Sequence, residues 1–303
     1  MFLRPTTLCY AITFALCLIS SPAIAADLEL HIGGGTIEPS LPDLPNTSRA
    51  DLTSWIQTAA DAVSTYFGRY PVKRAQIEVI ATDSGGIHGG VTYDGKLIRI
   101  HVGRDTKPGD LHDDWMLTHE MFHLGFPDLD EKYLWMNEGL SDYLEPLARA
   151  RIGNLTPEQA WAGFVEGMPQ GQPEPGDGGL DRTHTWGRTY WGGCIFWLLA
   201  DVRIREKTQN HRSLDDAIKA ILDAGGDGSE TWSIERVLEV GDKATGTNVL
   251  HELHEQLGTH AVKVDLEGLW GKLGIKKNGD TVVFDDAAPL AAIRRSMTER
   301  VKK

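Results

Sequence analysis

Apolar residues recur every three or four positions along much of the chain, and this spacing is typical of amphipathic helices. The clearest case is residues 48–67, where Leu52, Ile56 and Phe67 follow a threonine and a serine that can cap a helix. The same spacing predicts further helices at residues 109–125, 131–151, 157–167, 194–205, 214–222, 233–240 and 248–257. Within residues 131–151 it assigns these side chains to the core: Leu134, Leu140, Tyr143, Leu144 and Leu147. Most of the chain beyond residue 108 is therefore expected to be helical.

Alternation with period two marks the expected strands. Residues 75–81 alternate between apolar and polar positions and are expected to form a strand. Residues 90–93 and 96–102 flank Asp94-Gly95, a strong turn signal, and predict a hairpin. Residues 273–284 hold two short apolar runs around a polar turn and predict a terminal hairpin, followed by a tail.

The first residues follow a different pattern. Arg4 is the only charge before the apolar run 8–19, and Ala23-Ile24-Ala25 follows it, which is typical of a secretory signal peptide cleaved after Ala25. The apolar run is too short for a membrane span, so no stable span is expected after cleavage. The protein is thus expected to be exported, to the periplasm or the medium. Only Cys194 remains after cleavage, so no internal disulfide is expected, and its apolar setting predicts a buried side chain.

Composition is that of an ordinary globular protein, with 41% hydrophobic and 24% charged residues. The net charge of −13 argues against nucleic acid and anionic membrane surfaces as partners. Residues 39–45 hold three prolines and resemble a linker. The patterns divide the chain into a signal peptide, an α/β subdomain with the first hairpin, a helical subdomain, and a terminal hairpin with its tail. Their bounds are residues 1–25, 26–108, 109–258 and 259–303.

The candidate chemistry lies in the first helix of the helical subdomain, which contains the pattern H-E-x-x-H. His119 and His123 are four residues apart, so both imidazoles lie on one face of a helix and can bind one zinc ion. Glu120 can reach a water on that metal and act as its general base. A catalytic zinc needs a third protein ligand and an open position for water.

The third ligand is expected from the next helix. Glu138 follows a short connection of 14 residues after His123, which makes the two helices neighbours. Asp142 lies four residues further on, where it can accept the free ring N–H of a ligating histidine. H-E-x-x-H also occurs by accident on surface helices, but a second match at this distance favours a zinc site.

These two segments together resemble the gluzincins, a group of zinc metallopeptidases. The pattern N-E-x-x-S-D, from Asn137 to Asp142, resembles thermolysin-like enzymes. Residues 135–143 are equally similar to the W-L-N-E-G-x-x-x-Y of the aminopeptidase N and glycyl aminopeptidase groups, although the connection before them is trimmed. The resemblance implies an α+β, zincin-like fold with a mixed sheet in the amino-terminal part, a mostly helical carboxy-terminal part, and the active cleft between them. It also implies one zinc ion on His119, His123 and Glu138, with Asn137 and Asp142 supporting these ligands.

The resemblance further implies a peptidase in which Glu120 removes a proton from a zinc-activated water. In zincins an edge strand holds the substrate backbone, and here Gly90, Val91, Thr92 and Tyr93 occupy that place. The similar aminopeptidases carry a glutamate in a G-x-M-E-N segment that grips the substrate amino terminus, whereas this chain has none. We therefore expect cleavage at internal bonds of a peptide or protein substrate, with aminopeptidase specificity as the alternative.

An oxyanion donor is expected after the long loop 168–187. Tyr190 precedes an apolar helix, as the donor tyrosine does in the similar aminopeptidases, and His184 is the alternative donor. Tyr190 could instead pack against Trp186 and Trp191. The remaining histidines are expected at the surface, namely His112, His251, His254 and His260.

Two other functions stay open at this stage. The same constellation can hydrolyse a non-peptide amide or ester, and a zincin scaffold can serve as a binding protein without catalysis. Retention of ligands, base and supporting aspartate favours an enzyme. The sequence leaves the oligomeric state open.

Overall fold

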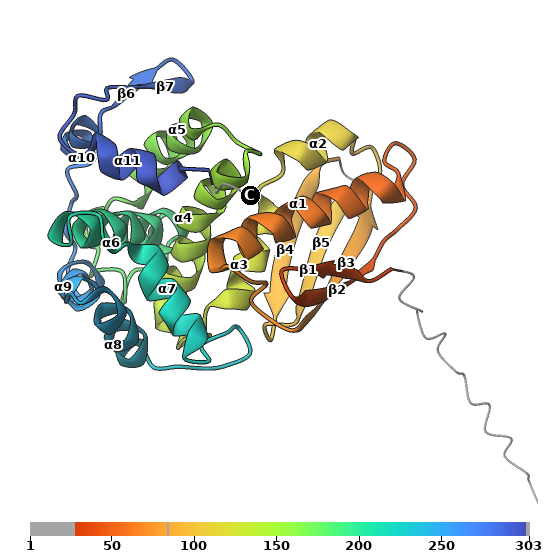
Figure 1. The fold of residues 1–303 in the computed structure, drawn as a ribbon, viewed down its shortest axis with the longest axis horizontal. Helices are drawn as coiled ribbons and strands as arrows, with labels where there is room; N and C mark the ends of the chain where they lie inside the picture. Colours follow the sequence, from red (N-terminus) through yellow and green to blue (C-terminus); the bar gives the residue numbers. More distant parts are fainter. Residues whose placement is uncertain (1–27, 84, 301–303) are drawn as a thin grey trace, which may run out of the picture.

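The computed structural model describes residues 28–83 and 85–300, in which a sheet on one side is joined to a body of helices on the other (Figure 1). The five-stranded sheet has the order β1-β2-β3-β5-β4. Its strands are β1 (Leu30–Ile32), β2 (Gly35–Ser40), β3 (Arg74–Thr82), β4 (Ile87–Tyr93) and β5 (Leu97–Gly103). The predicted signal peptide lies outside the described residues.

The predicted hairpin is confirmed and forms one edge of the sheet. β4 and β5 pair antiparallel, while β5 pairs parallel with β3. Both turn residues have positive φ, 47° at Asp94 and 57° at Gly95, which is the geometry that suits a two-residue hairpin turn. β4 has a partner on one side only, so its other edge is available for pairing.

The expected linker at residues 39–45 is wrong in its first part. β2 extends to Ser40 and pairs with β1 on one side and β3 on the other. Gly35, Ile37 and Pro39 are its buried positions, so the alternation of a strand is present. Glycine and proline are depleted in strands, and here they conceal that alternation.

Helix α1 (Arg49–Phe67) confirms the first predicted helix and covers the sheet (Figure 1). Ser48 caps it through a reciprocal pair of hydrogen bonds with Asp51, and Gly68 ends it in the left-handed conformation. Its buried face includes Leu52, Ile56 and Val63, which pack into the core. α1 also contacts helices of the carboxy-terminal part, so it joins the sheet to the helical half.

The predicted helix at 109–125 is broken into pieces. α2 (Pro108–Asp113) ends at Asp114, whose backbone is extended, and α3 (Met116–Phe122) begins two residues later and continues as a 3₁₀ turn, η1 (His123–Gly125). The Asp114 carboxylate accepts hydrogen bonds from the amides of Met116 and Leu117. The side chain thus starts a new helix, an alternative to helix continuation that aspartate readily offers.

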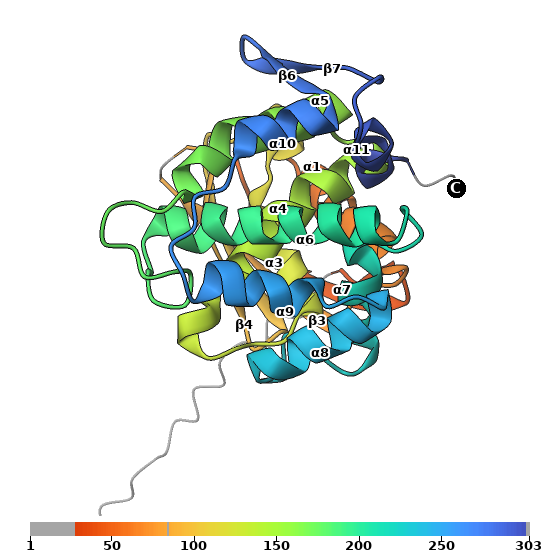
Figure 2. The same cartoon turned by 90° about the vertical axis from the view of Figure 1, so that its left-hand side faces the viewer.

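The helical half is confirmed as mostly helical, and Figure 2 shows α6, α8 and α9 in front of the strands. It consists of η2 (Glu131–Tyr133), α4 (Leu134–Ile152), α5 (Pro157–Gly167), η3 (Met168–Gly171), a π turn η4 (Arg188–Gly192), α6 (Gly193–Lys207), α7 (Leu214–Asp223), α8 (Ile234–Thr245), α9 (Val249–Leu253), η5 (His254–Gly258) and α10 (Leu266–Leu273). α6 is buried on most of its surface, and Cys194 on it is fully buried as expected. Leu134 is 46% exposed, so its assignment to the core is wrong.

Two glycines allow α4 and α6 to pack backbone against backbone. A Cβ placed on Gly139 would lie 2.3 Å from the Gly193 backbone, and one on Gly193 would lie 2.0 Å from the carbonyl oxygen of Trp135. No real side chain tolerates such distances, so both positions need glycine. The contact brings the turn before α6 next to the amino-terminal half of α4.

The carboxy-terminal hairpin is confirmed as β6 (Ile275–Asn278) and β7 (Thr281–Phe284). The expected tail contains a further helix, α11 (Ala291–Thr298), held by Arg294, which donates to the carbonyls of Leu273 and Gly274. Within residues 28–83 and 85–300, no helix is both long and apolar enough to cross a membrane.

Candidate metal centre

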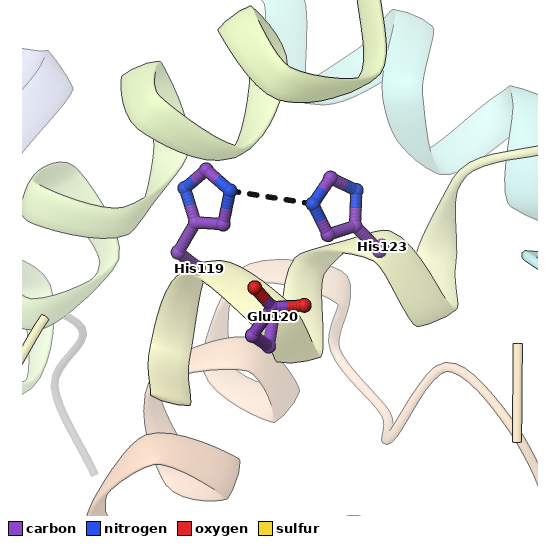
Figure 3. Close-up of side chains that lie close together, drawn as sticks. All are labelled: His119, Glu120 and His123. Atoms are coloured by element: carbon purple, nitrogen blue, oxygen red, sulfur yellow. Dashed lines mark hydrogen bonds between the residues drawn. The ribbon is translucent and has the colours of Figure 1, made fainter. Parts of the chain in front are cut away.

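α3 and the first residue of η1, which continues it, present His119 and His123 on one face, as their spacing predicts. Figure 3 shows the two rings turned toward each other, with the Glu120 carboxylate beside them. The two Nε2 atoms are 3.3 Å apart. His119 is buried and His123 half-buried, so one ring anchors the pair and the other borders the cleft.

The nearest further ligand atom comes from α4. Oε2 of Glu138 lies 3.1 Å from Nε2 of His119 and 3.6 Å from Nε2 of His123. A tetrahedral zinc with ligands about 2.0–2.1 Å away has neighbouring ligand atoms roughly 3.3 Å apart. The three observed distances surround this value, so these side chains fit a zinc ion.

Glu120 lies close to the same point, since a carboxylate oxygen and the ligand nitrogens of His119 and His123 fall within 4.8 Å of one another. Its Oε2 is occupied by a hydrogen bond of 2.7 Å from the hydroxyl of Thr92 on β4. The triangle made with Glu138 is tighter, and Glu120 is tied to the sheet. Glu138 is therefore the better candidate for a third ligand, and the Glu120 carboxylate lies beside the same point.

α4 also supplies contacts behind both histidines. Nδ1 of His119 lies 2.9 Å from Oδ1 of Asp142, as the sequence predicts. Nδ1 of His123 lies 3.5 Å from the Ser141 hydroxyl, a contact the sequence analysis missed. These partners orient the rings so that each Nε2 faces the metal position. Ser141 stands three residues after Glu138, on the same face, and this spacing is the signal that could have found it.

Charges in the centre are strongly coupled. Burial alone would raise the pKa of Glu138, but contacts with His119 and His123 outweigh it and lower that pKa well below its ordinary value. Burial would lower the pKa of His119, yet its contacts with Asp142 and Glu138 raise it to about 10. The two carboxylates thus favour the protonated form of His119.

Asn137 supports the centre without touching the ligands. Its side-chain amide donates a 3.1 Å hydrogen bond to the carbonyl of Pro127, in the connection that follows α3. This bond fixes the start of α4 against the end of the metal-binding segment. Asn137 also lies in the wall of the cleft.

Tyr190 lies on the π turn before α6. Its ring is stacked beside that of His119, with centroids 6.3 Å apart, and it also contacts Trp186. Burial, followed by the charges of Glu138, Asp142 and Glu120, raises the pKa of Tyr190 well above its ordinary value. Its hydroxyl therefore remains a hydrogen-bond donor. π turns of this kind occur often at functional sites.

The cleft has a volume of about 670 Å³ and lies between β4, α3 and α4. Its walls include the four predicted strand residues and the candidate catalytic groups: Gly90, Val91, Thr92, Tyr93, Glu120, His123, Glu138 and Tyr190. Gly90 approaches Glu120 so closely that a Cβ on it would lie 2.8 Å from the Glu120 Cγ. The backbone of β4 at Gly90 thus lies directly against the Glu120 side chain.

Two other residues named in the predictions, His184 and His254, do not line the cleft. His184 is exposed, and none of the described contacts brings it to the metal ligands. His254 is not a surface residue as expected: it is half-buried, 2.9 Å from Asp181, and stacked on Trp135. Asp181 also accepts a hydrogen bond from the Trp135 indole, so this group fastens the long loop to α4.

The fold resembles solved zinc peptidase structures at low sequence identity. An aminopeptidase N family protein from Idiomarina loihiensis is 14% identical, with a TM-score of 0.64 over 82% of this chain and 49% of its own. An M1 zinc metallopeptidase variant from Deinococcus radiodurans is 13% identical, with a TM-score of 0.50 over 78% and 52%. Legionella pneumophila aminopeptidase A, in complex with aspartic acid, is 16% identical, with a TM-score of 0.51 over 77% and 28%.

The fold is similar to part of the fold of M1 zinc metallopeptidases. The predicted α+β, zincin-like arrangement and the gluzincin resemblance are thereby confirmed at the level of the fold. This chain spans about half the length of the first two structures, and less of the third. No protein-family model matches the sequence, and no curated protein matches it either.

Proposed function

We propose that this protein is a zinc-dependent peptidase with Glu120 as its general base. The observation that carries the proposal is the triangle of His119, His123 and Glu138 ligand atoms, with the Glu120 carboxylate beside it in an open cleft. Three ligands, a base and an accessible position are what hydrolysis by such a centre requires. The fold likeness to zinc peptidases supports the same conclusion.

When bound, zinc would act as a Lewis acid toward the scissile carbonyl and the attacking water. Glu120 takes a proton from that water and returns it to the leaving amine. Thr92 holds the Glu120 carboxylate in place during both transfers. The Tyr190 hydroxyl donates a hydrogen bond to the oxygen on which negative charge develops.

The experiment begins with the metal. Purified protein should hold about one zinc ion, and His123→Ala or Glu138→Ala should lose most of it.

Glu120→Gln should keep the zinc and the fold but lose hydrolysis of a peptide library, because an amide cannot accept the proton. Glu131→Gln, at an exposed position of η2, is the matched control. Full turnover in Glu120→Gln would remove this residue from the reaction.

The edge of β4 favours cleavage within peptides. It can hold an extended substrate by main-chain hydrogen bonds, which require no free terminus. Thr92, the strand residue that faces the base, is a neutral side chain already bonded to Glu120 and offers no charge to a substrate ammonium. Amino-terminal acetylation of a peptide is therefore expected to leave its cleavage at internal bonds unchanged.

One observation favours an aminopeptidase as the second candidate. Asp128 is exposed in the cleft wall, and its backbone is fixed by hydrogen bonds to Glu230 and Trp232. No described residue forms an ion pair with its carboxylate, so it can bind an ammonium group. Mass spectrometry of matched acetylated and free peptides separates the two. Release of single residues from free peptides only, abolished by Asp128→Asn, would favour the aminopeptidase.

We also propose that residues 1–25 direct export and are removed. The support is the sequence pattern alone, an apolar run followed by Ala23-Ile24-Ala25. The amino-terminal mass of the protein recovered from the native host tests this. A mature chain that begins at Ala26 is the expected result, and a chain that retains Arg4 would contradict it.

A further inference from the structure

A second groove lies at the end of the sheet, beyond the hairpin turn. Its volume is about 950 Å³, larger than that of the catalytic cleft. It lies between the β1–β2 turn, the segment that joins α1 to β3, and the β4–β5 turn. Its charged lining residues are Arg69, Lys73, Arg74, Lys96 and Asp227.

The groove is continuous with the catalytic cleft. Gly95, Lys96 and Ser229 line both of them. From Gly90, which contacts Glu120, β4 runs on to Tyr93, about 10 Å at roughly 3.4 Å per residue, and the turn residues Asp94 and Gly95 follow it. A substrate held along the edge of β4 therefore enters this groove about five residues from the bond that is cut.

Four of the five charged residues that line the groove are cationic, in a protein whose net charge is −13. Arg69 pairs with Asp223, and Arg74 pairs with Glu29 and Glu38.

The two lysines differ from the two arginines. Lys73 and Lys96 are exposed, and among the described residues neither has a carboxylate partner. The one lining carboxylate, Asp227, already accepts from the amide and hydroxyl of Ser229. Two ammonium groups are thus available to a ligand.

We infer that this groove binds an acidic segment of the substrate, about five residues from the scissile bond. The inference rests on the proposed function for the substrate being a peptide, because the groove continues the cleft along β4. Lys73 and Lys96 provide the ion pairs. Exposed ion pairs contribute about 0.2–1 kcal/mol each, so two of them correspond to a preference of about 2–30-fold.

The test measures binding separately from cleavage. Fluorescent peptides carry two glutamates about five residues from a central bond, on the amino side in one and on the carboxyl side in the other, with glutamine versions as references. Binding to the Glu120→Gln protein is measured by anisotropy, at low and at high salt. One glutamate peptide should bind about 2–30-fold more tightly than its glutamine version, and salt should reduce this preference.

The double variant Lys73→Gln/Lys96→Gln should remove the preference, whereas Lys272→Gln/Lys277→Gln, the same charge change near the distant hairpin β6–β7, should retain it. Equal binding of glutamate and glutamine peptides, or a preference that survives the Lys73/Lys96 change, would overturn the inference. Wild-type cleavage of the same peptides is followed in parallel. Cleavage without the binding preference refutes the groove alone, and the binding preference without any cleavage refutes the peptidase while the groove stands.

Discussion

Thr92 contacts Glu120, the proposed base, through its hydroxyl. Its hydroxyl lies 2.7 Å from the Glu120 carboxylate and 2.9 Å from the Glu120 carbonyl. It thereby links the edge strand to the metal-binding helix and fixes the direction of the carboxylate. From the sequence, Thr92 is predicted to bind substrate. Only the packing of β4 against α3 shows that its hydroxyl points toward Glu120.

Removing this hydroxyl should slow the reaction without removing the metal. We expect Thr92→Val to keep its zinc and its KM but to lower kcat by roughly 10–150-fold, since a hydrogen bond to a charged group contributes about 1.5–3 kcal/mol. Thr92→Ser keeps a hydroxyl and should restore most of the rate. Steady-state kinetics with zinc analysis checks this, and an unimpaired valine variant would show that Glu120 needs no support.

His119 makes metal binding depend on pH. Its pKa of about 10 in the metal-free protein means that it carries a proton at all lower pH values, and a metal must displace that proton. Zinc binding at pH 7–9 is therefore expected to release about one proton from His119. Apparent zinc affinity should fall up to 10-fold for each unit that the pH falls below 10.

Calorimetry in buffers of different ionisation enthalpy measures this proton release. Asp142→Asn removes one of the two carboxylates that raise the pKa of His119, so it should release a smaller fraction of a proton at pH 9. His112→Gln, at an exposed histidine that contacts Asp113, is the control and should behave as wild type. Proton release that is equal in all three proteins would contradict the role of Asp142.

At the scale of elements, the contact between Gly139 and Gly193 sets the distance between Glu138 and Tyr190. Gly139 follows Glu138 on α4, and Gly193 directly follows the π turn that carries Tyr190. The sequence shows both glycines but no partner for either, because they are 54 residues apart. The π turn is also not predictable from the sequence, because its residues are spaced as at the start of an ordinary helix.

A methyl group at this contact should separate the helices. We expect Gly193→Ala to destabilise the fold by about 1–3 kcal/mol, the usual cost of overpacking, and to lower kcat more than zinc affinity. Gly163→Ala on α5 is the matched control, because a Cβ there meets no atom within 4 Å. The control should be neutral or stabilise slightly. Thermal unfolding and kinetics of both variants provide the measurement.

Other elements show where sequence patterns are sufficient. α1 and the β4–β5 hairpin carry local signals, a capping box and an Asp-Gly turn, and both form as predicted. The break at Asp114 depends on a carboxylate that also accepts from the Trp55 indole on α1. Such a tertiary contact produces no periodic pattern in the sequence, so the break in the helix cannot be predicted from the spacing of apolar residues.

Across the whole molecule, the metal centre joins the two halves. His119 and His123 belong to the helix against the sheet, and Glu138 belongs to the helical half. A bound ion should therefore stabilise the complete fold by linkage, about 2.7 kcal/mol at a free concentration 100 times Kd. Chelation should lower the unfolding temperature by several degrees, and zinc should restore it. Glu138→Ala should unfold at a temperature that zinc barely changes, whereas a large zinc shift in that variant would place the stabilising site elsewhere.

Helical spacing and short connections act locally, so the sequence predicts an α/β part, a helical part and the closeness of His119, His123 and Glu138. It did not predict the continuity of the cleft with the second groove. That continuity depends on the loop before α8 lying over the hairpin turn, where Gly228 donates its amide to the carbonyl of Leu124. Only the assembled fold brings these segments together.

Gly95 and Gly228 meet at that crossing, and a Cβ on Gly95 would lie 2.3 Å from the Gly228 backbone. At this point main chain forms part of the surface between cleft and groove, and Lys96 and Ser229 line both beside it. A substrate residue that passes over the two glycines meets no side chain of theirs, so the crossing itself would discriminate little between amino acids. Selection would then act at two separated places, on the bond in the cleft and on the charge in the groove. The residues between them form a spacer whose length matters and whose identity is free to vary.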